Sequence, residues 1–129
     1  FIKKTNILSI HMHYQKRYLN LINSKIIKQL KRPSYIVNTS RGEFINEKDL
    51  LNSLKRKLIE GAGLDVIKDE FKLKFRKNPK QNKLFNFFLN KRKYNLFIIP
   101  KQGGSNKSAW TTTELLLINQ LIRYEKNKI

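Results

Sequence analysis

Four short runs of apolar residues divide the chain up to Pro100. Each run is bounded by polar residues, glycine or proline, and most carry several β-branched side chains, which is typical of buried strands. Pro100 closes the last run, because proline has no backbone N–H to donate to a sheet. The predicted strands cover residues 6–12, 34–39, 61–67 and 96–99.

Apolar residues recur at helical spacing between these runs. Asn46 precedes Glu47 and Asp49, which predicts an N-cap followed by acids in the first turn, where the helix dipole favours them. Leucines three and four residues apart follow, as on the buried side of a helix. The segment from Lys68 to Lys83 is basic and is predicted to be an irregular connection. The predicted helices cover about 23–31, 47–58, 82–90 and 106–129.

Strands alternate with helices along the chain, which predicts an α/β fold. Short strands joined by helices imply right-handed crossovers and a parallel, Rossmann-like sheet with flanking helices. Ligands of such sheets bind at the carboxyl ends of the strands. The segments that follow the predicted strands are 11–13, 39–42, 65–70 and 100–104.

The composition narrows the class of protein. A chain of 129 residues with 40% hydrophobic residues suits one globular domain. There is no cysteine, which excludes disulfides and thiolate metal sites, and no other metal site is predicted. No apolar run is long enough to cross a bilayer and no signal peptide is recognisable, so we expect a cytoplasmic protein without membrane contact.

The formal net charge of +19 raises the hypothesis of a nucleic-acid partner. Lysine supplies 21 of the 28 basic residues, and the lysines are spread along the chain rather than gathered in one block. A lysine-, asparagine- and isoleucine-rich composition also arises from an AT-rich genome. Because no recognised nucleic-acid motif is present, a basic nucleic-acid binder is the least favoured hypothesis.

Three stretches resemble the D-isomer-specific 2-hydroxyacid dehydrogenase family. The first, NILSIHMH, is similar to the family's strand ending in Ser-Leu-His-x-Pro. The second contains the family's Asn-Thr-x-Arg-Gly turn and its Gly-Ala-Gly-Leu-Asp-Val strand; it reads YIVNTSRGEFINEKDLLNSLKRKLIEGAGLDVIKDE. The third, FIIPKQGG, resembles the Thr-Pro-His-x-Gly-Gly turn. The match is weakest at residues 71–93.

The resemblance implies roles for individual residues. Arg41 matches the arginine that binds the substrate carboxylate and keto oxygen, a task that suits a planar guanidinium. Asp65 matches an aspartate near the nicotinamide, and Glu70 matches the catalytic glutamate. The full set implied for cofactor binding is His11, Thr39, Ser40, Arg41, Asp65, Lys101, Gly103 and Gly104; for Thr39 and Ser40 ordinary turn chemistry, and for His11 a plain strand-end position, remain alternatives.

Lys101 occupies the position of the family's catalytic histidine. The family glutamate normally raises the histidine's pKa and orients it as the proton donor. Lysine starts with a much higher pKa, and Glu70 beside it would hold it charged. Two alternatives stay open: Lys101 serves as a substitute acid, or the site is dead or strongly impaired.

The chain also lacks a Gly-x-Gly-x-x-Gly turn for the cofactor pyrophosphate. We therefore expect residues 1–129 to form the C-terminal part of an NAD-binding domain, with a last helix leading back to a substrate domain outside the chain. Because the first residue is Phe1, we also expect the natural N-terminus to lie upstream. Such a half-domain would leave one edge of its sheet exposed.

The resemblance implies a fragment of an oxidoreductase that transfers a hydride between NAD and a small 2-hydroxy or 2-oxo acid, with NADP not excluded. It also implies a homodimer in the full-length protein. The alternative is a catalytically dead remnant that acts as a binding or assembly module, which Lys101 and the missing glycine turn favour.

Overall fold

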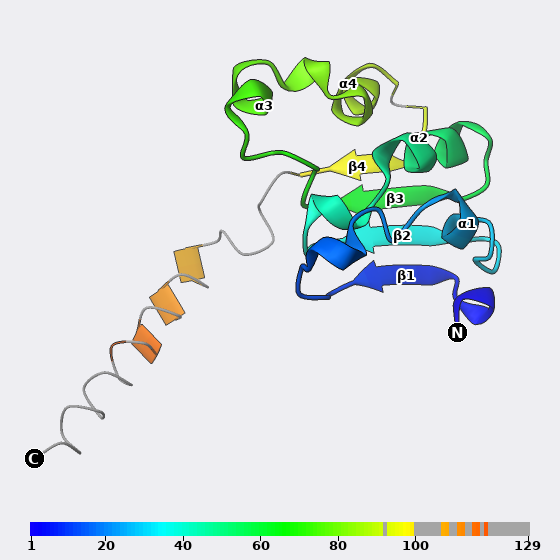
Figure 1. The fold of residues 1–129 in the computed structure, drawn as a ribbon, viewed down its shortest axis with the longest axis horizontal. Coiled ribbons are helices and arrows are strands. Elements are labelled where there is room, and N and C mark those ends of the chain that lie inside the picture. The colour runs from blue at the N-terminus through cyan, green and yellow to red at the C-terminus, as the bar shows by residue number, and fades with distance from the viewer. Residues whose placement is uncertain (92, 100–106, 109–110, 113–114, 117, 119–129) are drawn as a thin grey trace, which may run out of the picture.

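A computed structural model describes residues 1–91, 93–99, 107, 108, 111, 112, 115, 116 and 118. Its centre is a four-stranded sheet in which every neighbouring pair is parallel and the spatial order β1-β2-β3-β4 follows the chain (Figure 1). The α/β fold with a parallel sheet is confirmed. The strands are β1 (Ile7–Ile10), β2 (Tyr35–Asn38), β3 (Gly61–Leu64) and β4 (Leu96–Ile98).

Helices join successive strands, as the pattern predicted. Three of them begin at an asparagine whose side chain accepts backbone N–H groups of the first turn: Asn23, Asn46 and Asn82. Such caps satisfy donors that have no partner within the helix. The α-helices are α1 (Ser24–Ile27), α2 (Glu47–Lys55), α3 (Leu73–Lys77) and α4 (Lys83–Asn90).

The prediction of an irregular connection from Lys68 to Lys83 was wrong. This segment contains α3 and a 3-10 helix at Pro79–Gln81. Neither has a side-chain cap or a buried residue, so the two signals by which a helix is recognised in sequence are missing. Two other helices end earlier than predicted: α1 stops at Ile27 and α2 at Lys55. Lys57, just after α2, takes a left-handed conformation with φ 54° that ends the helical path.

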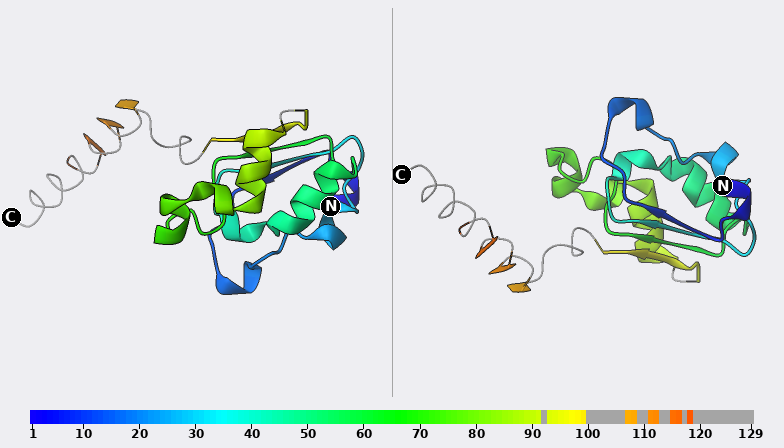
Figure 2. Two further views of the ribbon diagram at one scale, coloured as in Figure 1. Left: turned by 90° about the horizontal axis from the view of Figure 1, so that it is seen from above. Right: turned by 90° about the horizontal axis from the view of Figure 1, so that it is seen from below.

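The helices of all three connections between strands pack on the same face of the sheet (Figure 2). Every second side chain of β1 and β2 is buried, those between them are exposed or partly exposed, and the buried set faces α1, α2 and α4. On the other face Ile7 is 64% exposed and Phe97 is 59% exposed. Within the described part of the chain no helix covers that face, although parallel sheets are normally covered on both.

The predicted last helix is only partly described. Its described residues, Lys107, Ser108, Thr111, Thr112, Leu115, Leu116 and Ile118, are helical, and the remainder of 106–129 lies outside the described residues. No helix among the described residues is both long and apolar enough to cross a membrane.

Candidate functional site

The segments after the strands meet at the carboxyl edge of the sheet and border two hollows there. One has a volume of about 480 Å³ and is lined by His11, Met12, His13, Tyr14, Ser40 and Arg41. The other has a volume of about 370 Å³ and is lined by Val37, Thr39, Gly63, Leu64, Asp65, Phe97 and Ile99. Residues from the turn after β2 thus line both hollows.

The turn that carries Arg41 is built by Asn38, the last residue of β2. Asn38 is fully buried; its side chain donates to the carbonyl of Arg41 at 2.8 Å and accepts from the backbone N–H of Ser40 at 3.1 Å. The Arg41 guanidinium is exposed and donates one bond to the carbonyl of Ser40 at 2.8 Å. Since arginine has five N–H donors, a two-point contact with a carboxylate remains available.

Asn38 received no role from the sequence, although it opens the Asn-Thr-x-Arg-Gly motif. Its signal was a polar residue at a position that the alternation of β2 places in the core. A buried amide must have partners, and both of its partners belong to the Arg41 turn. Asn38 therefore fixes the path of that turn.

Gly42 brings the Arg41 turn against the loop that follows β3. A Cβ added at Gly42 would lie 2.1 Å from the carbonyl carbon of Ile67 and 2.2 Å from the backbone nitrogen of Lys68. Only a residue without a side chain permits this approach. The turn of Arg41 and the loop of Asp65 and Glu70 are consequently held side by side.

The loop after β3 is folded on itself by Glu70. The carboxylate of Glu70 accepts from the backbone N–H of Ile67 at 3.0 Å, and the Glu70 N–H donates back to the Ile67 carbonyl at 3.3 Å. Asp69 between them has a left-handed φ of 62°. Asp65 continues the sheet, because its N–H donates to the carbonyl of Asn38 at 2.9 Å.

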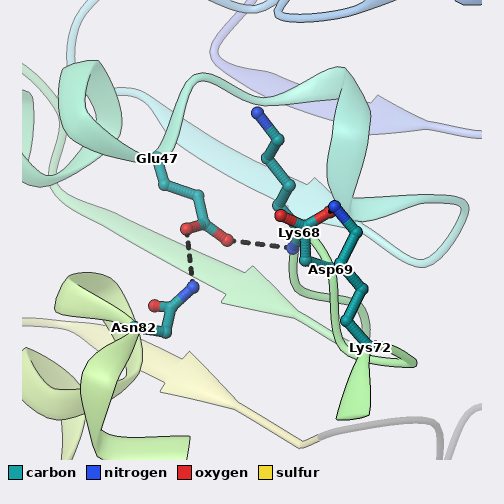
Figure 3. A network of polar contacts seen from close by, with 5 residues as sticks. All are labelled: Glu47, Lys68, Asp69, Lys72 and Asn82. Atoms are coloured by element: carbon teal, nitrogen blue, oxygen red, sulfur yellow. Dashed lines mark hydrogen bonds and ion pairs between the residues drawn. The ribbon is translucent and has the colours of Figure 1, made fainter. Parts of the chain in front are cut away.

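Glu47 in the first turn of α2 contacts the same loop (Figure 3). Its carboxyl group accepts from the backbone N–H of Lys68 at 2.9 Å and from the side chain of Asn82 at 2.8 Å. Burial raises the pKa of Glu47; the bonds from Asn82 and Lys68 and the charge of Lys68 oppose this, and the charge of Asp69 adds to it.

The first strand end contributes His11. It is exposed, and its Nε2 lies 2.7 Å from the hydroxyl oxygen of Ser9. The hydroxyl of Ser40 donates to the carbonyl of Met12, which joins the end of β1 to the Arg41 turn. No group of three or more acids and histidines able to hold a metal occurs among the described residues.

The structure thus groups most of the predicted site residues. His11, Ser40 and Arg41 line the larger hollow, and Thr39 and Asp65 line the smaller one. Glu70 lines neither and lies partly buried within its loop. Lys101, Gly103 and Gly104 lie outside the described residues.

Comparisons of the sequence and of the structure with known proteins point to the same family. The sequence model described as D-isomer specific 2-hydroxyacid dehydrogenase, NAD binding domain, matches residues 1–95. A glyoxylate reductase of Thermococcus litoralis is 29% identical over 128 residues, which cover 99% of this chain and 35% of that protein.

Solved structures agree with this result. The NAD-complexed D-isomer specific 2-hydroxyacid dehydrogenase of Lactobacillus delbrueckii ssp. bulgaricus has a TM-score of 0.76 at 25% identity, over 97% of this chain and 39% of that one. D-2-hydroxyisocaproate dehydrogenase shares the fold with a TM-score of 0.84 at 18% identity, over 99% and 39%. The chain spans 35–39% of the length of these three relatives. It belongs to the D-isomer-specific 2-hydroxyacid dehydrogenase family, of which it carries part of the NAD-binding domain.

Proposed function

We propose that this chain supplies the nicotinamide and substrate-carboxylate side of an NAD-dependent oxidoreductase that interconverts a small 2-hydroxy acid and its 2-oxo acid. The observation that carries the proposal is the turn at the end of β2. Asn38 holds Arg41 at the rim of a hollow, and Gly42 keeps this turn against the loop of Asp65 and Glu70. Arg41 would bind the acid's carboxylate through two N–H groups and polarise the adjacent carbonyl.

In this proposal the smaller hollow would receive the nicotinamide ring. Its walls are largely apolar side chains of β2, β3 and β4, and Thr39 and Asp65 supply polar groups at the rim. A negative Asp65 would favour the positively charged, oxidised ring. The bound cofactor supplies the hydride, and the protein supplies position and charge.

The phosphate half of the cofactor finds no counterpart in this sequence, because none of its glycines forms a Gly-x-Gly-x-x-Gly turn. The chain is therefore proposed to bind the nicotinamide end only. The pyrophosphate and adenosine would be held by the remainder of a longer protein, which we further propose to be a homodimer like other members of the family.

Proton transfer is assigned to Glu70 and Lys101. In this proposal the ammonium group of Lys101, which stands at the family's histidine position, would donate a proton to the carbonyl oxygen during reduction, with Glu70 as its acidic partner. The lysine would then be regenerated from solvent.

A titration of the chain with reduced nicotinamide mononucleotide and with NADH tests the cofactor assignment. We expect saturable binding of both with similar affinity, since only the nicotinamide end has a site here. In NMR spectra of the chain, the backbone amide chemical shifts of Thr39 and Asp65 should change on binding. Absence of saturable binding, or tight binding of NADH alone, would contradict the assignment of this half-site.

The second candidate is a module that has lost turnover and persists in binding or assembly. It is favoured by Lys101 at the histidine position. Turnover of a 2-oxo acid by the longer protein with native Lys101 would exclude it. If native protein is inactive and Lys101→His restores turnover, the binding site is intact and the acid alone was lost.

A further inference from the structure

Glu47 connects three elements that the proposed site depends on (Figure 3). It lies in the first turn of α2, directly after the N-cap Asn46. One carboxyl oxygen accepts from the backbone N–H of Lys68 in the loop after β3, and the other accepts from the side-chain amide of Asn82. Asn82 in turn caps α4, because its side-chain oxygen accepts from the N–H of Phe85 at 2.9 Å.

The Lys68 amide is also the point where the loop meets the Arg41 turn. The same peptide that donates to Glu47 lies against Gly42, where a Cβ would approach its nitrogen to 2.2 Å. Glu47 and Gly42 therefore contact one peptide group. The carbonyl of this Ile67–Lys68 peptide accepts from the backbone N–H of Glu70 at 3.3 Å, and the N–H of Ile67, one peptide earlier, donates to the Glu70 carboxylate at 3.0 Å.

We propose that Glu47 is a positioning residue, whose carboxyl group holds the loop of Asp65 and Glu70 in register with the Arg41 turn. The inference rests on the proposed function for the meaning of that register, since it assumes that Arg41, Asp65 and Glu70 act together. Glu47 itself touches neither substrate nor cofactor in this assignment.

A carboxyl group suits this position because two donors converge on it. A carboxylate has two acceptor oxygens and no N–H, so it satisfies both Lys68 and Asn82. A glutamine of the same shape offers one acceptor and one donor, so its amide nitrogen would face a donor. The charged neighbours are Lys68 and Asp69, and Asp69 is itself paired with Lys72 at 3.0 Å.

The donor and acceptor roles of Asn82 and Glu47 can be exchanged by substitution. Glu47→Gln sets an amide nitrogen against the amide nitrogen of Asn82. Asn82→Asp sets two carboxyl groups against each other, while the cap on Phe85 is kept because aspartate is a good N-cap. In the double variant the new glutamine side chain would accept from Lys68 and donate to the new aspartate side chain, which restores every bond. Such a cycle isolates the pair from effects on each residue alone.

Asp49→Asn is the matched control. Asp49 lies in the same turn of α2 and also carries a carboxylate, but it accepts from the backbone N–H of Ser24 at the start of α1. The control removes the same charge from the same helix end, and asparagine can still accept that bond. A general effect of charge on α2 would appear in it equally.

Amide hydrogen exchange of the chain, read residue by residue, tests the proposal. In Glu47→Gln and in Asn82→Asp, exchange at Lys68 and Glu70 should quicken about tenfold relative to the strand amides, as for loss of one ordinary hydrogen bond. The double variant and Asp49→Asn should match the native chain. Uniform change across all amides, or no recovery in the double variant, would show a purely structural role and overturn the proposal.

Affinity for reduced nicotinamide mononucleotide adds the functional readout. Each single variant should bind it up to about tenfold more weakly, because the competent loop is less populated, and the double variant should recover. Unchanged affinity in variants whose loop exchange has quickened would separate the loop from the site and refute the positioning role. If the native chain binds no nicotinamide, the proposed function fails, and exchange at Lys68 still decides whether Glu47 holds the loop.

Discussion

Replacing Gly42 by alanine should destabilise the chain strongly, because the added methyl group has no space. It would lie 2.1 Å from the carbonyl carbon of Ile67 and 2.2 Å from the nitrogen of Lys68, and ordinary contacts begin near 3.4 Å. The obstacle is backbone, and the neighbouring Val66 and Ile67 are 1% and 2% exposed, so the loop cannot move aside freely. Strain of the glycine conformation plays no part, since no glycine among the described residues has a positive φ.

The cost follows from overpacking. Inserted methyl groups in tight cores cost about 1–3 kcal/mol, and a contact with fixed backbone belongs at the upper end, at about 3 kcal/mol. For a domain of this size that corresponds to a fall of roughly 10 °C in the unfolding midpoint. Thermal and urea unfolding followed by circular dichroism measure both quantities.

Gly63→Ala is the matched control within the same fold. A Cβ at Gly63 meets no atom within 4 Å, so stability should change by less than about 1 kcal/mol. Because Gly63 lines the smaller hollow, the same variant should weaken nicotinamide binding while the fold persists. Equal stability of Gly42→Ala and Gly63→Ala would refute the claim that the turn and the loop are held in contact at Gly42.

Four further outcomes are expected. Arg41→Lys should raise the KM of the longer protein for its 2-oxo acid at least about tenfold, since a two-point contact becomes a point charge; an unchanged KM would remove Arg41 from the site. Asn46→Ala should cost about 1 kcal/mol in urea unfolding through loss of the cap on Asp49. Burial raises the pKa of Glu47 in the folded state, so its contribution to stability is full below the ordinary carboxyl range and is lost as pH rises through the folded pKa. Native chain and Glu47→Gln, unfolded in urea from acidic to neutral pH, should therefore differ in slope with that sign. Lys101→His should raise turnover in the longer protein, measured from NADH absorbance.

Local signals predicted where the four strands and the helices α1, α2 and α4 begin. The apolar runs and the cap at Asn46 each act within a few residues, and the structure places strands and a helix there. The ends were less predictable, because a helix ends where tertiary contacts end. The short helices between β3 and α4 could not be recognised, because they have neither a side-chain cap nor a buried side chain.

The candidate site divides in the same way. Arg41 and Asp65 follow from the motif and from the rule that ligands meet strand ends. Glu47 was recognised as a first-turn acid, but its partners Lys68 and Asn82 lie 21 and 35 residues away in the sequence. Only the fold reveals that it forms a hydrogen bond to the loop after β3. Asn38 likewise required the knowledge that its strand position is fully buried. The proposed roles of all these site residues remain predictions, and Lys101, Gly103 and Gly104 lie outside the described residues.

The face of the sheet that no described helix covers bears on the solubility of this chain. Ile7, Tyr35 and Phe97 expose apolar surface there, which draws copies together, while a net charge of +19 drives them apart. Dissolved salt weakens only the second of these forces, and at 0.1 M the repulsion is screened beyond about 10 Å. The isolated chain should therefore be most soluble in dilute buffer and should aggregate as salt is added. A basic protein that is precipitated by bound polyanions behaves in the opposite way, because added salt weakens that binding and dissolves it.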